Sequence, residues 1–181
     1  MATVTLRGAP VHTCGSLPLV GDPCPPFLLT RADLTELSSV DLEGQRVVLN
    51  VFPSLDTPTC AASVRAFNAR AAEVPNTAVL CISEDLPFAM GRFCGAEGLT
   101  RVTPASAFRH PGFGLALGLT LVDSPFRGLL ARAVLVLNED GTVVYTELVP
   151  DLAREPDYES ALAALTRHHR PAPEDSLEGV E

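Results

Sequence analysis

Apolar residues form two long runs in the first half of the chain, with a helical pattern between them. The first run covers residues 47–52 and is almost unbroken, as is typical of a central strand covered on both faces. The second run covers residues 77–83 and has the same character. Between them, apolar positions recur at steps of four and three; they are Cys60, Val64, Phe67, Ala71 and Val74. This order predicts two parallel strands joined by an amphipathic helix in a right-handed crossover.

Weaker patterns complete the expected architecture. They predict an amino-terminal hairpin over 3–14, a strand over 27–30, a short helix over 112–117, antiparallel strands over 132–137 and 142–149, and a final helix over 156–166. We expect irregular structure over 33–41 and over the rest of 100–127, which glycine and proline interrupt. Ser83 and Asp85 are candidate caps before Pro87, so we expect a helix from there to about residue 94.

Cys60 occupies the first turn of the expected central helix. Unpaired N–H groups and the positive end of the helix dipole favour an anion at that place. This effect is worth only about 0.3–1 kcal/mol, and a cysteine reacts as its thiolate, so we expect a cation and hydrogen-bond donors nearby.

Thr57 and Pro53 stand just before this cysteine. The Thr57 hydroxyl could donate to the sulfur or cap the helix, and both roles favour the same type of residue. Pro53, like Pro58, fixes the backbone. It serves either as the wall of a rigid pocket or as an ordinary turn residue.

Arg132 is the candidate for the expected cation. It opens an otherwise apolar strand, from whose end its guanidinium could reach the thiolate. The alternative is an arginine that extends along the strand end into water. The pattern alone favours this alternative.

The other cysteines are expected to differ in role. Cys14 and Cys24 lack the C-x-x-C spacing of a redox motif and form a poor zinc set with His12. Cys24 stands among prolines, and we expect it to be exposed. Cys81, inside an apolar strand, is expected to behave as an inert buried residue. Cys94 lies in a helix weakened by glycine, which costs about 1 kcal/mol relative to alanine, so its segment should unwind easily.

Composition limits the classes of function. The 181 residues are 46% hydrophobic and carry a formal net charge of −9, which indicates a globular domain and argues against nucleic-acid partners. No amino-terminal stretch has the pattern of a signal peptide, and no apolar run approaches membrane-spanning length. Five cysteines without framework spacing fit reduced cytoplasmic thiols. We therefore expect a cytoplasmic protein that has no membrane contact.

The string Pro53-x-x-x-Thr57-x-x-Cys60 resembles the active-site signature of the peroxiredoxins. Longer blocks resemble the thiol peroxidases, an atypical two-cysteine subfamily found in bacteria. These blocks are residues 52–57, 60–65, 80–83, 85–89, 92–99, 128–134 and 155–159. The resemblance covers about residues 1–166, and blocks of this length exceed what short motifs produce by chance.

The resemblance implies a thioredoxin-like α/β fold, with a mixed central sheet flanked by helices and an N-terminal β-hairpin. It assigns Cys60 as the peroxidatic cysteine and Cys94 as the resolving one. It also implies that Thr57 and Arg132 hold a hydroperoxide and that Pro53 shields the pocket. An intrachain Cys60–Cys94 disulfide would be recycled by thioredoxin in a homodimer, with no cofactor and no metal. Residues 1–166 would form the domain and 167–181, rich in charge and proline, a flexible tail.

Two rival functions use the same chemistry. One is a redox sensor whose Cys60–Cys94 disulfide changes its affinity for another protein. The other is a dithiol oxidoreductase, which is disfavoured because 33 residues separate the two cysteines where C-x-x-C is expected. The sequence cannot distinguish the sensor from the peroxidase, because both require oxidation of the same thiol.

Overall fold

The computed structural model describes residues 1–71 and 74–167. The tail expected over 167–181 lies outside them except for Arg167, which belongs to the last helix. The strands are β1 Thr3–Leu6, β2 Ala9–His12, β3 Leu28–Arg31, β4 Glu36–Ser38, β5 Arg46–Val51, β6 Thr77–Ser83, β7 Thr103–Ser106, β8 Ala133–Leu137 and β9 Val143–Leu148. The helices are α1 Pro58–Ala71, α2 Pro87–Glu97, α3 Gly112–Ala116 and α4 Tyr158–Arg167, with a short 3-10 helix η1 over Ser39–Leu42. Within this part of the chain, no helix has the length and apolar character that a membrane crossing needs.

Seven strands form one mixed sheet in the order β4-β3-β7-β6-β5-β8-β9. β5 pairs with β6 in parallel, as the strand-helix-strand pattern predicts, and with β8 in antiparallel orientation. β1 and β2 form a separate antiparallel hairpin. The expected mixed sheet flanked by helices and the amino-terminal hairpin are therefore confirmed.

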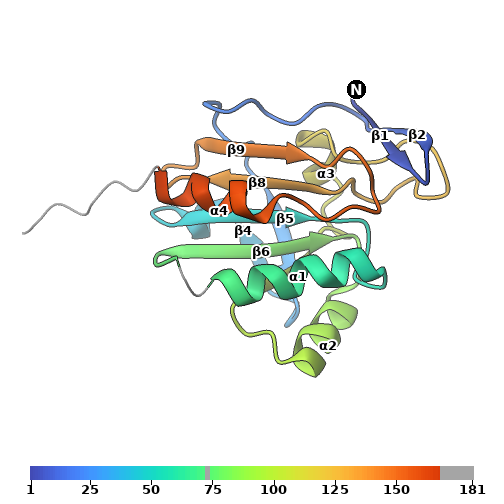
Figure 1. Cartoon of the computed structure of the whole chain (residues 1–181). Coiled ribbons are helices and arrows are strands. Elements are labelled where there is room, and N and C mark those ends of the chain that lie inside the picture. Colours follow the sequence, from blue (N-terminus) through green and yellow to red (C-terminus); the bar gives the residue numbers. More distant parts are fainter. Residues whose placement is uncertain (72–73, 168–181) are drawn as a thin grey trace, which may run out of the picture.

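Side chains that alternate along the central strands build a core on each face of the sheet. Val48 of β5 and Cys81 of β6 belong to the core shared with α1 and α4, the two helices that lie side by side on one face in Figure 1. Leu49 and Leu80 point the other way and pack with the segments around α3 and β3. All six residues of β5 are buried, which explains its nearly continuous apolar sequence.

Three features of the fold differ from the sequence predictions: two unexpected strands and the end of one helix. The stretch 33–41 contains β4 and part of η1, and β7 lies within the segment 100–127 that we expected to be irregular. Both strands have at most four residues, too few for alternation to be recognised. α2 continues to Glu97 and ends at Gly98, whose φ of 65° is the left-handed conformation common after a helix.

The predicted start of α2 at Pro87 is correct, but the predicted caps are not. The residue before the helix is Leu86, and no side chain caps it. Asp85 instead turns its carboxylate toward the segment that follows β5. The reason is tertiary: the end of β5 lies beside the end of β6 in the parallel pair.

The sheet brings three distant segments to one edge. β5 ends at Val51, which pairs with Ala133 at the start of β8. α1 begins a few residues after β5, so its amino end lies at this same edge (Figure 1). The hairpin joins them there, because the Thr5 N–H donates to the Pro150 carbonyl (2.8 Å) and the Leu152 N–H to the Thr5 carbonyl (2.9 Å).

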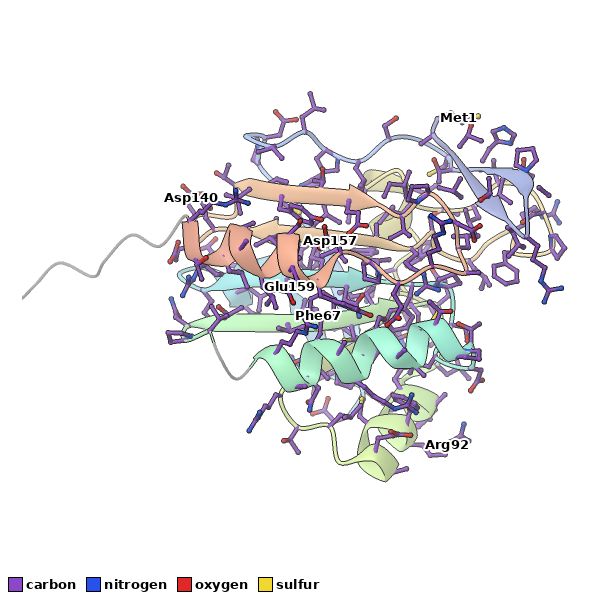
Figure 2. The ribbon with its side chains drawn as sticks, in the orientation of Figure 1. Met1, Phe67, Arg92, Asp140, Asp157 and Glu159 are labelled. Atoms are coloured by element: carbon purple, nitrogen blue, oxygen red, sulfur yellow. The ribbon has the colours of Figure 1, made fainter. Side chains whose placement is uncertain are left out.

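Phe67 provides a test of this packing. Its ring is fully buried and meets the Tyr158 ring edge-on at 5.2 Å between centroids, joining α1 to α4 (Figure 2). We expect Phe67→Ala to lower the free energy of unfolding by about 3–5 kcal/mol, because the cavity cannot collapse fully. Urea denaturation followed by circular dichroism measures the loss. Phe88, which is 67% exposed, is the control, and Phe88→Ala should change stability by less than about 0.5 kcal/mol. Equal losses would contradict the packing described.

Candidate active site

The Cys60 sulfur is surrounded by donors although the residue is 0% exposed. The Thr57 hydroxyl lies 2.6 Å from the sulfur, and Nη2 of Arg132 lies 3.3 Å from it. Cys60 is the third residue of α1, so the positive end of the helix dipole adds to the same field. A hydroxyl donor, a cation and a helix end therefore all favour negative charge on this sulfur.

Thr57 takes both of the roles that its sequence position allows. Its hydroxyl oxygen accepts from the Cys60 N–H at 3.4 Å, and its carbonyl accepts from the Ala61 N–H at 3.1 Å, as in a helix cap. The hydroxyl also lies 3.2 Å from the Ser54 carbonyl, so its single proton can go to this oxygen or to the sulfur. The capping contacts fix the hydroxyl beside the thiol.

Arg132 does not extend into water, so the interpretation that the pattern alone favoured is wrong. The residue is 1% exposed, and its Nε and Nη2 donate to the Leu152 carbonyl at 3.2 and 2.7 Å. The loop after β9 folds back over the sheet edge and supplies this carbonyl. The side chain is thereby held against Cys60.

Nη1 of Arg132 has no hydrogen-bond partner within the described residues. A buried guanidinium N–H without an acceptor is costly, and this one belongs to a group that borders an open pocket. An oxygen-bearing ligand in the pocket would supply the missing acceptor.

The pocket beside Cys60 has a volume of about 260 Å³. Thr57, Arg132 and Pro53 line it, and the first two also contact the Cys60 sulfur, so the structure brings four of the five predicted site residues together. Pro53 is buried in the wall, as the pocket interpretation expected. The remaining wall residues are Leu6, Arg7, Asp56, Pro58, Thr59, Phe126, Leu152 and Ala153.

Cys94 is placed apart from this group. It lies on α2 with its side chain buried, and both it and Cys60 carry free thiols. Burial raises the pKa of the Cys94 thiol. Cys94 therefore stays protonated at neutral pH while α2 is folded.

Cys81 and Cys24 are both shielded. Cys81 lies within β6 beside the Asn50 amide (3.6 Å), and burial raises the pKa of its thiol to about 12. Cys24 is half-buried against the core, which corrects the expectation that it is exposed, and burial raises its pKa to about 11. Among residues 1–71 and 74–167, no cluster of three His, Cys, Asp or Glu side chains is arranged as metal ligands would be.

Comparison with known proteins identifies the family of this chain. The family model described as Redoxin matches residues 19–162. The chain belongs to the redoxin family. It is 58% identical to the thiol peroxidase of Mycobacterium tuberculosis over 165 residues, which cover 91% of this chain and 99% of that protein. The thiol peroxidase of Corynebacterium glutamicum is 54% identical with the same coverage.

Solved structures support the same family. A peroxiredoxin-like protein from Aquifex aeolicus superposes with a TM-score of 0.87 at 34% identity, covering 92% of this chain and 97% of that one. The resemblance to the thiol peroxidases noted from the sequence is thereby confirmed. Within this family the present chain is a peroxiredoxin-type enzyme.

Two features of the site had no usable signal in the sequence. The Leu152 carbonyl that holds Arg132 is a backbone group, which any residue at that position would supply. Asp85 contacts the Ser54 hydroxyl across 31 positions of the sequence. Its position suggested only a helix cap, because sequence patterns reveal local partners better than distant ones.

The shielding of Cys24 predicts a pH-dependent reaction with iodoacetamide. Because the pKa of Cys24 is raised to about 11, its thiolate fraction should grow about tenfold per pH unit between pH 8 and 10. In guanidinium-unfolded protein the ordinary pKa of about 8.5 applies, so the rate should level off above pH 9. Mass spectrometry of the peptide that contains Cys24 measures both rates. A native rate that levels off at pH 9 would contradict the shielding.

Proposed function

We propose that the protein reduces hydroperoxides, which include hydrogen peroxide and organic hydroperoxides, with Cys60 as the attacking thiolate. The observation that carries this proposal is the convergence of Arg132 and Thr57 on the Cys60 sulfur beside a pocket with a donor to spare. Membership of the redoxin family and similarity to thiol peroxidases support it.

In the first step the Cys60 thiolate attacks the terminal oxygen of the hydroperoxide, HO–OR. A sulfur–oxygen bond forms, the oxygen–oxygen bond breaks, and the alkoxide takes a proton from water to leave as the alcohol. Cys60 is oxidised to a sulfenic acid. The Arg132 guanidinium and the Thr57 hydroxyl stabilise the charge that moves from sulfur to the leaving oxygen.

In the second step Cys94 resolves the sulfenic acid. Its thiol loses a proton and attacks the Cys60 sulfur, the disulfide forms, and the hydroxyl group leaves as water. A disulfide needs Cα atoms within about 7 Å, and the two cysteines stand on different helices. We propose that α2 unwinds locally to bring them together, because Gly91 and Gly95 weaken its interior.

An external dithiol then returns both cysteines to thiols. We propose thioredoxin for this role and a homodimer as the working form, both from the family resemblance. The cytoplasm is the proposed compartment, because free thiols persist there.

Turnover with hydrogen peroxide and a thioredoxin system tests the two cysteine roles. We expect Cys60→Ser to be inactive, because no thiolate remains in the pocket. Cys94→Ser should consume about one peroxide per chain and then stop as a sulfenic acid. Sustained turnover by Cys60→Ser would refute the proposal. Slow oxidation coupled to partner binding, without turnover in the unmodified protein, would favour a sensor.

The role of Arg132 is tested by Arg132→Met. We expect the second-order rate constant with peroxide to fall about 100- to 1000-fold, the usual cost of one preorganised charge-stabilising donor. Arg46 is the matched control, since it is also a buried arginine that donates to backbone carbonyls, at the other end of β5. Arg46→Met should destabilise the fold but keep the rate constant within about threefold. Equal kinetic losses in the two variants would contradict the assignment. Competition with a haem peroxidase of known rate measures both constants.

A further inference from the structure

The carboxylate of Asp85 joins the active-site turn to the segment that leads into α2. Its Oδ1 accepts from the Ser54 hydroxyl at 2.7 Å, and its Oδ2 accepts from the Leu55 N–H at 2.7 Å. Oδ2 also accepts from the Ser83 hydroxyl at 2.6 Å, at the end of β6. The Asp85 side chain thus connects the turn before Cys60 to the end of β6.

The turn that Asp85 holds determines where the Thr57 hydroxyl lies. The Ser54 hydroxyl, bound to Asp85, accepts from the Asp56 N–H at 3.2 Å. The Ser54 carbonyl accepts from the Thr57 N–H at 3.1 Å and lies 3.2 Å from the Thr57 hydroxyl. A shift of Ser54 therefore moves the hydroxyl that stands 2.6 Å from the Cys60 sulfur.

The same residue anchors the start of the helix that carries Cys94. Asp85 comes two positions before Pro87, the first residue of α2, and no side chain caps this helix. The Asp85 carbonyl accepts from the Ser106 hydroxyl at 2.5 Å, and its N–H donates to the Ser83 hydroxyl at 3.2 Å. Bonds to the Asp85 backbone therefore hold the entry to α2 in place of a cap, and the carboxylate ties the same residue to Ser54 and Leu55.

We propose that Asp85 is a positioning residue, which holds Thr57 against Cys60 for the peroxide reaction and restrains the start of α2. The inference rests on the proposed function. In this proposal one carboxylate connects two parts of the site. One is the turn that must stay rigid when peroxide reacts with Cys60, and the other is α2, which must open for the disulfide to form.

A double-mutant cycle on the reaction of the reduced protein with hydrogen peroxide tests the first role. We expect Asp85→Ala to lower the second-order rate constant at least tenfold. In the Thr57→Val background the same change should cost less than twofold, because the hydroxyl that Asp85 positions is already absent. Equal losses in the two backgrounds would overturn the role through Thr57.

Asp140 supplies the control for loss of a carboxylate. It accepts from the Thr142 N–H at 2.9 Å in the β8–β9 turn, at the other end of the sheet (Figure 2). Asp140→Ala should leave the rate constant within twofold of the wild type. A loss equal to that of Asp85→Ala would show that the effect is not specific to the site.

Ser54→Ala keeps the proposal testable if Asp85→Ala does not fold. It removes the bond to Oδ1 and the weaker bond from the Asp56 N–H, and it leaves the Leu55 and Ser83 bonds of the carboxylate in place. We expect a loss of at least threefold that again depends on Thr57. An unchanged rate constant would overturn the proposal.

The rate of disulfide formation provides a second readout, and we expect it to change in a direction that a purely structural role does not predict. Quenched alkylation after a peroxide pulse follows the loss of the Cys94 thiol. We expect disulfide formation to be faster in Asp85→Ala than in the wild type, because the bonds from the carboxylate to Ser54 and Leu55 are lost while the backbone bonds of Asp85 remain. An equal or slower step would overturn the restraint on α2. If the wild type itself does not react with peroxide at Cys60, the proposed function fails; if it reacts and Asp85→Ala is equally fast, only the positioning role fails.

Discussion

The contact between Arg132 and the Cys60 sulfur is the interaction on which the rest of the site depends. A guanidinium that is 1% exposed is costly unless its donors are satisfied. Two of its nitrogens bind the Leu152 carbonyl, and one of these also reaches the sulfur. The antiparallel pairing of β5 with β8 makes this possible, because it places the start of β8 beside the segment leading to α1. The sheet thus places the Arg132 guanidinium beside the amino end of α1, and both favour negative charge on the Cys60 sulfur.

This arrangement creates a conflict that the chain has to resolve. The peroxide step requires a rigid turn around Cys60, with Thr57 fixed within hydrogen-bond distance of the sulfur. The proposed disulfide step requires Cys94, buried on another helix, to leave its place. Glycines within α2 and the missing side-chain cap make that helix the weaker of the two. On the proposed mechanism, the segment that moves is therefore the one that carries Cys94, and the turn around Cys60 stays in place.

The sequence predicts the parts of this account that depend on local or strongly periodic signals. The two central strands and α1 follow from continuous apolar runs and a clear helical period. The position of Cys60 in the first turn follows from the same pattern. β4 and β7 were missed because strands of three or four residues carry too little alternation, and β7 contains Pro104. Only the family resemblance indicated that Arg132 belongs to the site, since an arginine at a strand end is ordinarily solvated.

Tertiary contacts account for what could not be predicted. The burial of Cys24 depends on which segments pack over the proline-rich loop, and composition pointed the other way. Two partners of the Asp85 carboxylate, Ser54 and Leu55, stand about thirty positions away, so a local interpretation made it a helix cap. The spare N–H of Arg132 is visible only once the Leu152 carbonyl is in place.

The central claim is that peroxide oxidises Cys60 first and that Cys94 is its partner. Cleavage after arginine separates Cys60, Cys81 and Cys94 into different peptides, within 47–65, 71–92 and 93–101. The most direct measurement is therefore mass spectrometry of the reduced protein after one equivalent of hydrogen peroxide, with the remaining thiols alkylated in guanidinium so that the buried cysteines are accessible. The account predicts one disulfide-linked pair, 47–65 with 93–101, with Cys14, Cys24 and Cys81 fully alkylated. Oxidation that begins at Cys81 or Cys24 while Cys60 remains alkylatable would contradict it.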